Sequence, residues 1–251
     1  ATGEYTARRI PRWSQPVTGS GIAILYLSIY AAFGFYQLIS PVVALTFLFL
    51  VVGTAAVLAI RYESRIIALM GITGAFLAPL LLGSDMSDQR FALLGYILIV
   101  DLGILAVSTF YNWRWFIRIS MVATYFLFGL WISTIPANEL IVAEWGVSAA
   151  FLIFVGATTL FHVIWRRPPT RWDLALAAAN AVSFYVLTVV LLWIEYEAWF
   201  GLITLLIGVF YSGVGVAVLK RSGAPREVAR YAMYIALVFG TLAAALQFTG
   251  V

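Results

Sequence analysis

Residues 91–118 read FALLGYILIVDLGILAVSTF-YNWRWFIR, and this stretch decides the fold class of the chain. Its first part, Phe91–Phe110, is apolar except for one carboxylate near the middle, Asp101. About twenty apolar residues at a rise of 1.5 Å each match a bilayer hydrocarbon core of roughly 30 Å. The second part is aromatic and basic, as membrane surfaces favour. The stretch therefore predicts a transmembrane helix, a basic turn and the beginning of another helix.

The whole chain has the composition of a membrane protein. Hydrophobic residues make up 63% of its 251 residues and charged residues only 10%, whereas soluble domains carry about 25% charged residues. There is no cysteine and a single histidine, His162, which excludes disulfides, thiolate nucleophiles and cysteine-ligated metal sites. The formal net charge of +4 comes from residues at the ends of apolar segments. It therefore indicates a membrane surface and no nucleic-acid partner.

The unit of apolar span, short turn and apolar span recurs along the sequence. We therefore predict an all-α, polytopic integral membrane protein, a helical bundle of about nine transmembrane helices in repeated antiparallel hairpins. Residues 1–17 are expected to be a cytoplasmic juxtamembrane segment and residues 18–251 a single transmembrane domain. The first span is too long for the apolar region of a signal peptide, so it is expected to stay in the protein. The expected spans are 18–38, 41–60, 66–82, 91–110, 119–135, 145–165, 173–194, 199–219 and 228–251.

Proline and capping residues punctuate these spans. Pro136 is expected to end the fifth span, and Pro79 to kink the third. Thr170 and Asp173 form a capping-box pattern at the start of the seventh span. The short apolar run 140–143 is expected to lie along the membrane surface before the sixth span.

The charged residues predict an orientation. When the loops are assigned alternately to two faces, every lysine and arginine except Arg90 falls on the N-terminal face. The opposite face holds the loop carboxylates Asp85, Asp88, Glu139, Glu144, Glu195 and Glu197. Because cations stay on the cytoplasmic side, the N-terminus is expected in the cytoplasm and the C-terminus outside, in a bacterial cytoplasmic (inner) membrane.

The basic turns recur at nearly equal intervals, at Arg61, Arg114, Arg167 and Arg221. An internal repeat of a two-helix hairpin would produce this spacing, and so would the ordinary length of two spans with their loops. Both explanations stay open. Such turns attract anionic lipid headgroups, so membrane lipids are expected partners. The candidate contacts are Arg114, Arg118, Arg166, Arg167 and Arg221.

Several short motifs in the first half resemble a known family. They are Gly3-Glu4 with Arg8-Arg9, the run 18–27 (TGSGIAILYL), the turn 61–64 (RYES), the run 74–81 (GAFLAPLL), and Gly95-Tyr96 with Asp101-Leu102-Gly103. The match, best over residues 3–130, is to the bacterial predicted membrane protein family DUF2339. Members of that family usually carry Asn where Asp101 stands, and they are often longer. The resemblance implies a portion of a larger chain and brings no activity, catalytic residue or ligand with it.

Asp101 is the first candidate for a functional site. An ionisable group at mid-bilayer costs about 2.5–3.5 kcal/mol and is a functional hypothesis by default. No cation is expected at its depth, so desolvation favours the neutral carboxyl group. As a functional group it could couple proton movement to transport. As a structural group it would bond to a neighbouring helix, for example through Asn180, Ser183, Tyr96 or a backbone carbonyl.

The remaining polar residues favour helix packing. Asn180 lies in an alanine-rich segment of the seventh span and is expected to bond across a close helix contact. The small pairs Gly71/Ala75, Gly74/Ala78 and Gly208/Ser212 are expected to face neighbouring helices. His162 is expected at the interface, since a lone histidine cannot complete a haem or zinc site.

Two function classes remain. Because nucleophile, metal and phosphate-binding motifs are missing, the sequence favours a non-enzymatic protein with no catalytic, metal or cofactor site. The first class is a structural or assembly component of a membrane complex, whose partners would be other membrane subunits or the rest of a longer chain. The alternative is a transporter or lipid-handling protein with a cavity near Asp101. The two differ in whether Asp101 is held by a neighbouring helix or lines a cavity together with Asn180.

Overall fold

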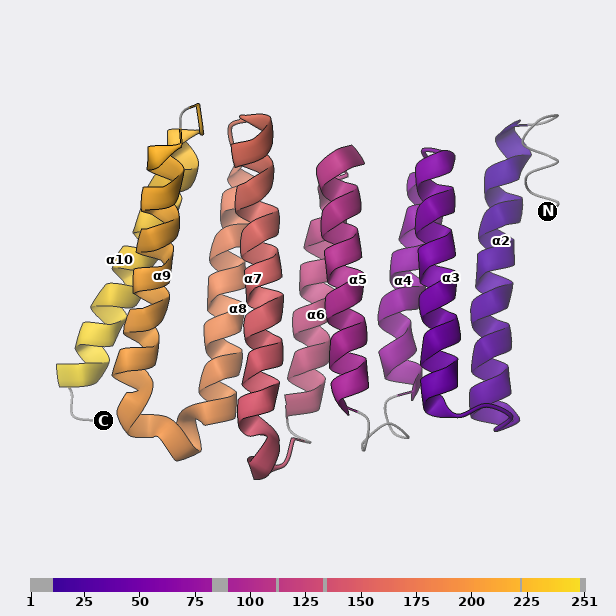
Figure 1. Ribbon diagram of the computed structural model, residues 1–251, viewed down its shortest axis with the longest axis horizontal. Helices are drawn as coiled ribbons and strands as arrows, with labels where there is room; N and C mark the ends of the chain where they lie inside the picture. Colours follow the sequence, from indigo (N-terminus) through magenta and orange to yellow (C-terminus); the bar gives the residue numbers. More distant parts are fainter. Residues whose placement is uncertain (1–10, 83–89, 112, 133–134, 222, 249–251) are drawn as a thin grey trace. The chain divides into compact units, whose positions relative to one another are not determined.

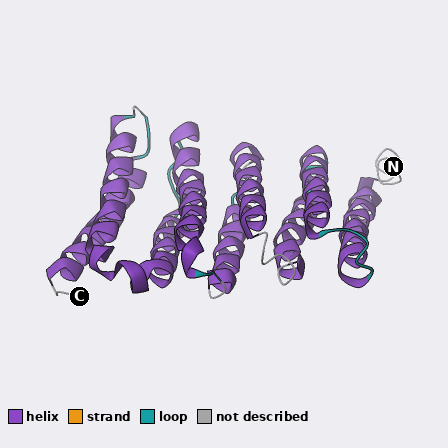
Figure 2. Ribbon diagram, turned by 60° about the horizontal axis from the view of Figure 1, so that its bottom comes forward, coloured by secondary structure: helices purple, strands orange, loops and turns teal. Residues whose placement is uncertain are grey.

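The computed structural model describes residues 11–82, 90–111, 113–132, 135–221 and 223–248. The described residues are almost entirely helical, and no strand occurs among them (Figure 2). The contacts divide the chain into two compact units, 1–127 and 128–251. Whether these units form one transmembrane domain stays a prediction.

The first unit is a set of antiparallel helices in chain order (Figure 1). The α3–α4 and α5–α6 turns, which carry Arg61 and Arg114, lie at the same end of this unit. Helix α6 continues past the boundary of the unit at Leu127. The elements are α2 (Pro11–Tyr30), the π-helical turn η1 (Ala31–Phe35), α3 (Pro41–Arg61), α4 (Arg65–Leu82), α5 (Arg90–Tyr111) and α6 (Trp115–Ile132).

The second unit contains two long hairpins. The α7–α8 and α9–α10 turns lie at the same end of this unit (Figure 1). The elements are the 3-10 turn η3 (Ala137–Glu139), α7 (Leu140–Trp165), α8 (Arg171–Tyr196), the 3-10 turn η4 (Glu197–Trp199), α9 (Phe200–Lys220) and α10 (Arg226–Phe248).

Small residues bring helices together within each unit. A Cβ atom at Gly71 of α4 would lie 3.0 Å from the Cβ of Ala55 on α3. On α9, a Cβ at Gly208 would lie 3.2 Å from the carbonyl oxygen of Ala236 on α10, and one at Gly215 would lie 3.3 Å from that of Ala229. The sequence pattern identified Gly71 and Gly208. It missed Gly215, seven residues after Gly208 on the same face of α9.

The helices have the length and hydropathy of membrane spans, which confirms the all-α polytopic fold. Seven stretches of the described residues qualify as candidate spans by these two measures. One of them, Arg171–Lys220, contains both α8 and α9, and the apolar helix Arg65–Leu81 is shorter than the length required. The count of about nine spans therefore stays a prediction.

The starts of α2, α7 and α8 bear on three predictions from the sequence. Helix α2 begins at Pro11, so residues 11–17 of the expected juxtamembrane segment are helical. Residues 140–143 form the first turn of α7 and do not make a separate surface segment. The capping box is confirmed: the Thr170 N–H donates to Asp173 Oδ2 at 2.8 Å, and the Asp173 N–H donates to Thr170 Oγ1 at 3.4 Å.

Candidate functional site: polar side chains buried between helices

Asp101 lies on α5 and is 1% exposed. Both of its carboxyl oxygens are bonded to hydroxyl groups of α6. The Ser120 hydroxyl donates to Oδ1, and the Thr124 hydroxyl donates to Oδ2 at 2.8 Å. Ser120 and Thr124 are fully buried. Because they are four residues apart, they lie on one face of α6, so one carboxyl group joins two helical turns of the neighbouring helix.

These contacts give each carboxyl oxygen a hydrogen-bond partner from the protein. A hydroxyl can donate one hydrogen bond and accept others, so the pair can serve Asp101 in either charge state. This is the kind of arrangement that the structural alternative expects, but the partners differ from those suggested by the sequence. The sequence signal that could have identified them is the hydroxyl pair at i and i+4 on the next span.

A second polar contact compensates for a proline. Pro79 lies inside α4, and proline has no N–H to donate to the carbonyl four residues earlier, that of Ala75. The Tyr96 hydroxyl on α5 donates to this carbonyl at 3.1 Å. Tyr96 is 5% exposed, and its ring packs edge-on against Phe49 of α3. A hydroxyl from the adjacent helix therefore replaces the missing backbone donor.

Asn180 joins two neighbouring helices of the second unit by a hydrogen bond. It is fully buried on α8, and its side-chain amide donates to the carbonyl oxygen of Phe151 on α7 at 3.2 Å. The Phe151 ring stacks on Phe184 of α8 with a centroid separation of 4.3 Å. The predicted helix-joining bond is thus present. Asp101 and Asn180 belong to different units, and each has bonding partners within its own unit.

His162 is buried between helices, and its expected position at the depth of the membrane interface stays a prediction. It is 1% exposed, near the end of α7. Its Nδ1 lies 2.9 Å from the carbonyl oxygen of Arg167, and its Nε2 lies 3.5 Å from Asp173 Oδ2 on α8. The same carboxylate caps α8. One aspartate therefore holds both the start of its own helix and the end of the preceding one.

The opposite end of the same hairpin carries another polar link. The Thr188 hydroxyl of α8 donates to Glu144 Oε1 of α7 at 2.8 Å. Glu144 is one of the loop carboxylates that the sequence places on one face of the membrane. Among the described residues, no group of three or more His, Asp or Glu side chains could hold a metal ion.

The candidate lipid-binding arginines fall into two groups. Arg114 and Arg118, at the α5–α6 turn, are half-buried, whereas Arg166, Arg167 and Arg221 are exposed. In the second unit the Arg166 side chain lies over Gly223: a Cβ there would be 3.1 Å from its Nε. The guanidinium of the α7–α8 turn therefore lies over the α9–α10 turn.

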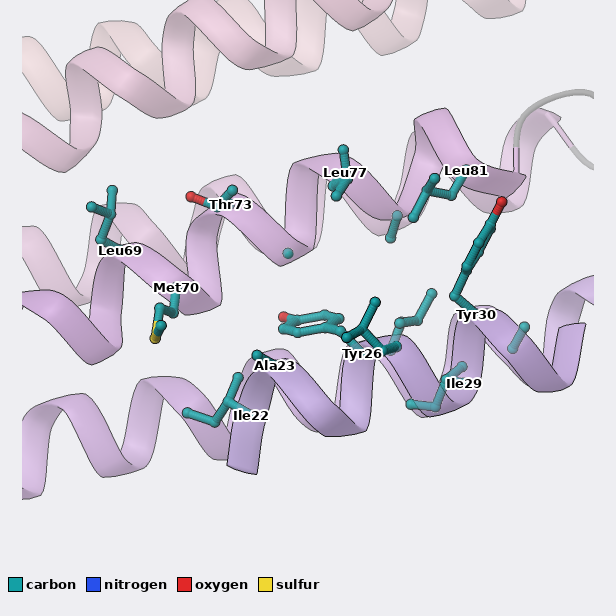
Figure 3. A pocket seen from close by; sticks show the side chains of 15 residues that line it. Ile22, Ala23, Tyr26, Ile29, Tyr30, Leu69, Met70, Thr73, Leu77 and Leu81 are labelled. Carbon is teal, nitrogen blue, oxygen red and sulfur yellow. The ribbon is translucent and has the colours of Figure 1, made fainter. Parts of the chain in front are cut away.

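Two apolar cavities lie beside α4 in the described part of the first unit, and neither is lined by Asp101. One, of about 420 Å³, lies among α2, α3 and α4 (Figure 3). The other, of about 230 Å³, is lined by residues of α3, α4 and α5 and by Phe116 of α6. Its lining includes Val100 and Gly103, which flank Asp101 in the sequence. The carboxyl group itself faces α6.

These features define a polytopic all-α membrane protein whose buried polar side chains link neighbouring helices. Comparison with protein families identifies the family of the chain. The chain belongs to the family described as "Predicted membrane protein (DUF2339)", whose model matches residues 1–251. The resemblance in the first half therefore extends over the whole chain. Neither a search of curated proteins nor a search of solved structures found a match.

Proposed function

We propose that this membrane protein is a non-enzymatic structural or assembly component of a membrane complex. The observation that carries the proposal is the bonding of Asp101. Its two carboxyl oxygens accept hydrogen bonds from Ser120 and Thr124, so this buried carboxyl group is used in holding α5 to α6. A proton-coupling carboxylate would instead need access to water on at least one side of the membrane.

The other buried polar groups support the same proposal. Asn180 joins α7 to α8, and Tyr96 joins α5 to α4. In a bilayer the hydrophobic effect does not drive helices together, so hydrogen bonds and small-residue contacts provide much of the attraction. A protein that uses its polar groups in this way presents apolar faces to lipid or to other membrane subunits.

The orientation is part of the proposal. Basic residues occupy the turns at one end of each unit, which supports a cytoplasmic N-terminus and an outside C-terminus. The exposed Arg166, Arg167 and Arg221 are then available to anionic headgroups of the inner leaflet. The bacterial cytoplasmic membrane is the compartment that this charge distribution fits.

A lipid-handling role is the second candidate, because two apolar cavities lie beside α4 in the described part of the first unit. The 230 Å³ cavity lies next to the Asp101 segment of α5. In a lipid-handling protein, Asp101 would turn from α6 towards this cavity during the transport cycle.

Reconstituted vesicles distinguish the two candidates. Proton entry would be followed with an internal pH-sensitive dye and lipid transfer with a fluorescent phospholipid, for the wild-type chain and for Asp101→Asn. The structural role predicts the rates of protein-free vesicles for both proteins, and a flux that Asp101→Asn abolishes would contradict it. In mildly solubilised native membranes, the structural role also predicts migration well above the 27.7 kDa of the chain. Migration as a single free chain would oppose it.

A further inference from the structure

The larger of the two cavities beside α4 has a closed floor and an open rim. Its floor includes Ile22, Ala44 and Ala78, each no more than 3% exposed. Its rim includes Leu27 and Leu77, which are 67% and 46% exposed. The cavity therefore opens sideways from the helices α2 and α4, and Figure 3 shows Tyr26, Tyr30 and Met70 in the space between these two helices.

One aromatic ring shapes this space. Tyr26 of α2 lies across the cavity against α4 (Figure 3), and a Cβ at Gly74 would come within 2.2 Å of its ring. Only glycine leaves room for this contact. The Tyr26 hydroxyl donates to the carbonyl oxygen of Gly71 at 3.2 Å. The polar atom of the ring is therefore used within the protein, and the ring presents a carbon surface to the cavity.

The dimensions of the cavity match a hydrocarbon chain. Its lining residues run from Leu69 to Leu81 along α4, which at 1.5 Å per residue is a length of roughly 18 Å. The cavity thus extends along the helix axes over roughly 18 Å of a hydrocarbon core of roughly 30 Å. Its volume of about 420 Å³ lies within the usual range of small-molecule sites.

We propose that this cavity binds one acyl chain of a bilayer phospholipid, with Tyr26 as its aromatic wall. The proposal does not rest on the structural role proposed above. Water does not fill the space because the lining is apolar and gives it few hydrogen-bond partners. If the space were empty, the residues that line it would lose their van der Waals contacts on that side. The cavity opens to the side, where acyl chains are the surrounding solvent, and they lie parallel to its long axis.

The test uses a phosphatidylglycerol that carries a photoactivatable diazirine in one acyl chain. The full chain in detergent is titrated with this lipid and illuminated, and the modified residues are located by peptide mass spectrometry. The proposal predicts saturable labelling at cavity residues such as Met70 and Thr73. Two filling variants, Ala23→Phe and Thr73→Phe, should lose the saturable labelling. The matched control is Ile24→Phe, next to Ala23 but 61% exposed and outside the lining; it should label as the wild type does.

Labelling spread evenly over the exposed apolar positions, without saturation, would overturn the proposal. Unchanged labelling in folded filling variants would do the same, and so would a cross-link that joins the cavity residues to a second copy of the chain. If neither filling variant folds, competition on the wild-type chain decides. Excess unlabelled phosphatidylglycerol must then remove the label at Thr73 at a concentration that leaves the label at Ile24 in place, and equal loss at both positions rejects the site.

Discussion

The Tyr96 hydroxyl should matter only because Pro79 is there. Tyr96→Phe keeps the ring, and therefore its packing against Phe49, but removes the donor to the Ala75 carbonyl. A buried carbonyl left without a donor costs about 1–3 kcal/mol, while hydrogen bonds between membrane helices average about 0.6 kcal/mol and reach about 1.7. We expect Tyr96→Phe to lower the free energy of unfolding by about 1–2 kcal/mol.

The proline provides the decisive comparison. Pro79→Ala restores an N–H that can donate to the Ala75 carbonyl within α4. In this background the Tyr96 hydroxyl becomes redundant, and Tyr96→Phe should cost less than about 0.5 kcal/mol. The difference between the two backgrounds is a coupling free energy of about 1 kcal/mol, within the range found for residues that share a partner.

The free energies would be measured by steric trapping of the full chain in bilayer-like micelles. The control is Tyr234→Phe, the same chemical change at a tyrosine that is 59% exposed; it should change stability by no more than about 0.5 kcal/mol. An equal cost of Tyr96→Phe in both backgrounds would refute the reasoning, because the hydroxyl would then act independently of the proline. A Tyr96→Phe variant that costs nothing in the chain that retains Pro79 would also refute it.

Three further predictions concern the second unit and the topology. Gly208→Val should destabilise the α9–α10 contact by about 1–3 kcal/mol, since its side chain would press on the Ala236 carbonyl; unfolding in detergent that matches the wild type would contradict this. Thr170→Ala should cost about 1 kcal/mol through loss of the α8 cap, and Thr170→Ser should restore most of it; equal losses would mean that the hydroxyl is not the cause. Because the chain lacks cysteine, single introduced cysteines report topology directly. Glu63→Cys should resist an impermeant thiol reagent added outside intact cells, and Glu197→Cys should react with it. Equal reactivity at the two positions would reject the orientation.

Hydropathy was enough to predict the elements of this fold. The apolar span around Asp101 and the basic turn after it predicted a helix over 91–110, and α5 covers Arg90–Tyr111. Bilayer thickness fixes the length of each apolar run, and prolines and charges fix its ends, so these features are local. Residues 11–17 are too polar for a span, yet they form the first turns of α2. They can still be helical, since helix formation does not require hydrocarbon around it.

The partners of the polar residues could not be predicted in the same way. Asp101 was expected to bond a neighbouring helix, but the choice of Ser120 and Thr124 depends on how α6 is rotated about its axis. Hydropathy carries little information about that rotation, because lipid-facing and helix-facing residues are similarly apolar. The contact between His162 and Asp173 could not be predicted for a related reason. Asp173 already had a local role as a cap, and only the packing of α7 on α8 brings the two together.

The link between α5 and α6 through Asp101 is the central claim, and a double-mutant cycle between Asp101 and Thr124 tests it most directly. Asp101→Ala, Thr124→Val and the double variant would be unfolded by steric trapping. If the bond is direct, the sum of the two single-variant losses in unfolding free energy should exceed the loss in the double variant by about 0.6–1.7 kcal/mol. Losses that add to within about 0.3 kcal/mol would mean that the two side chains do not hold each other, and the structural role of Asp101 would be contradicted.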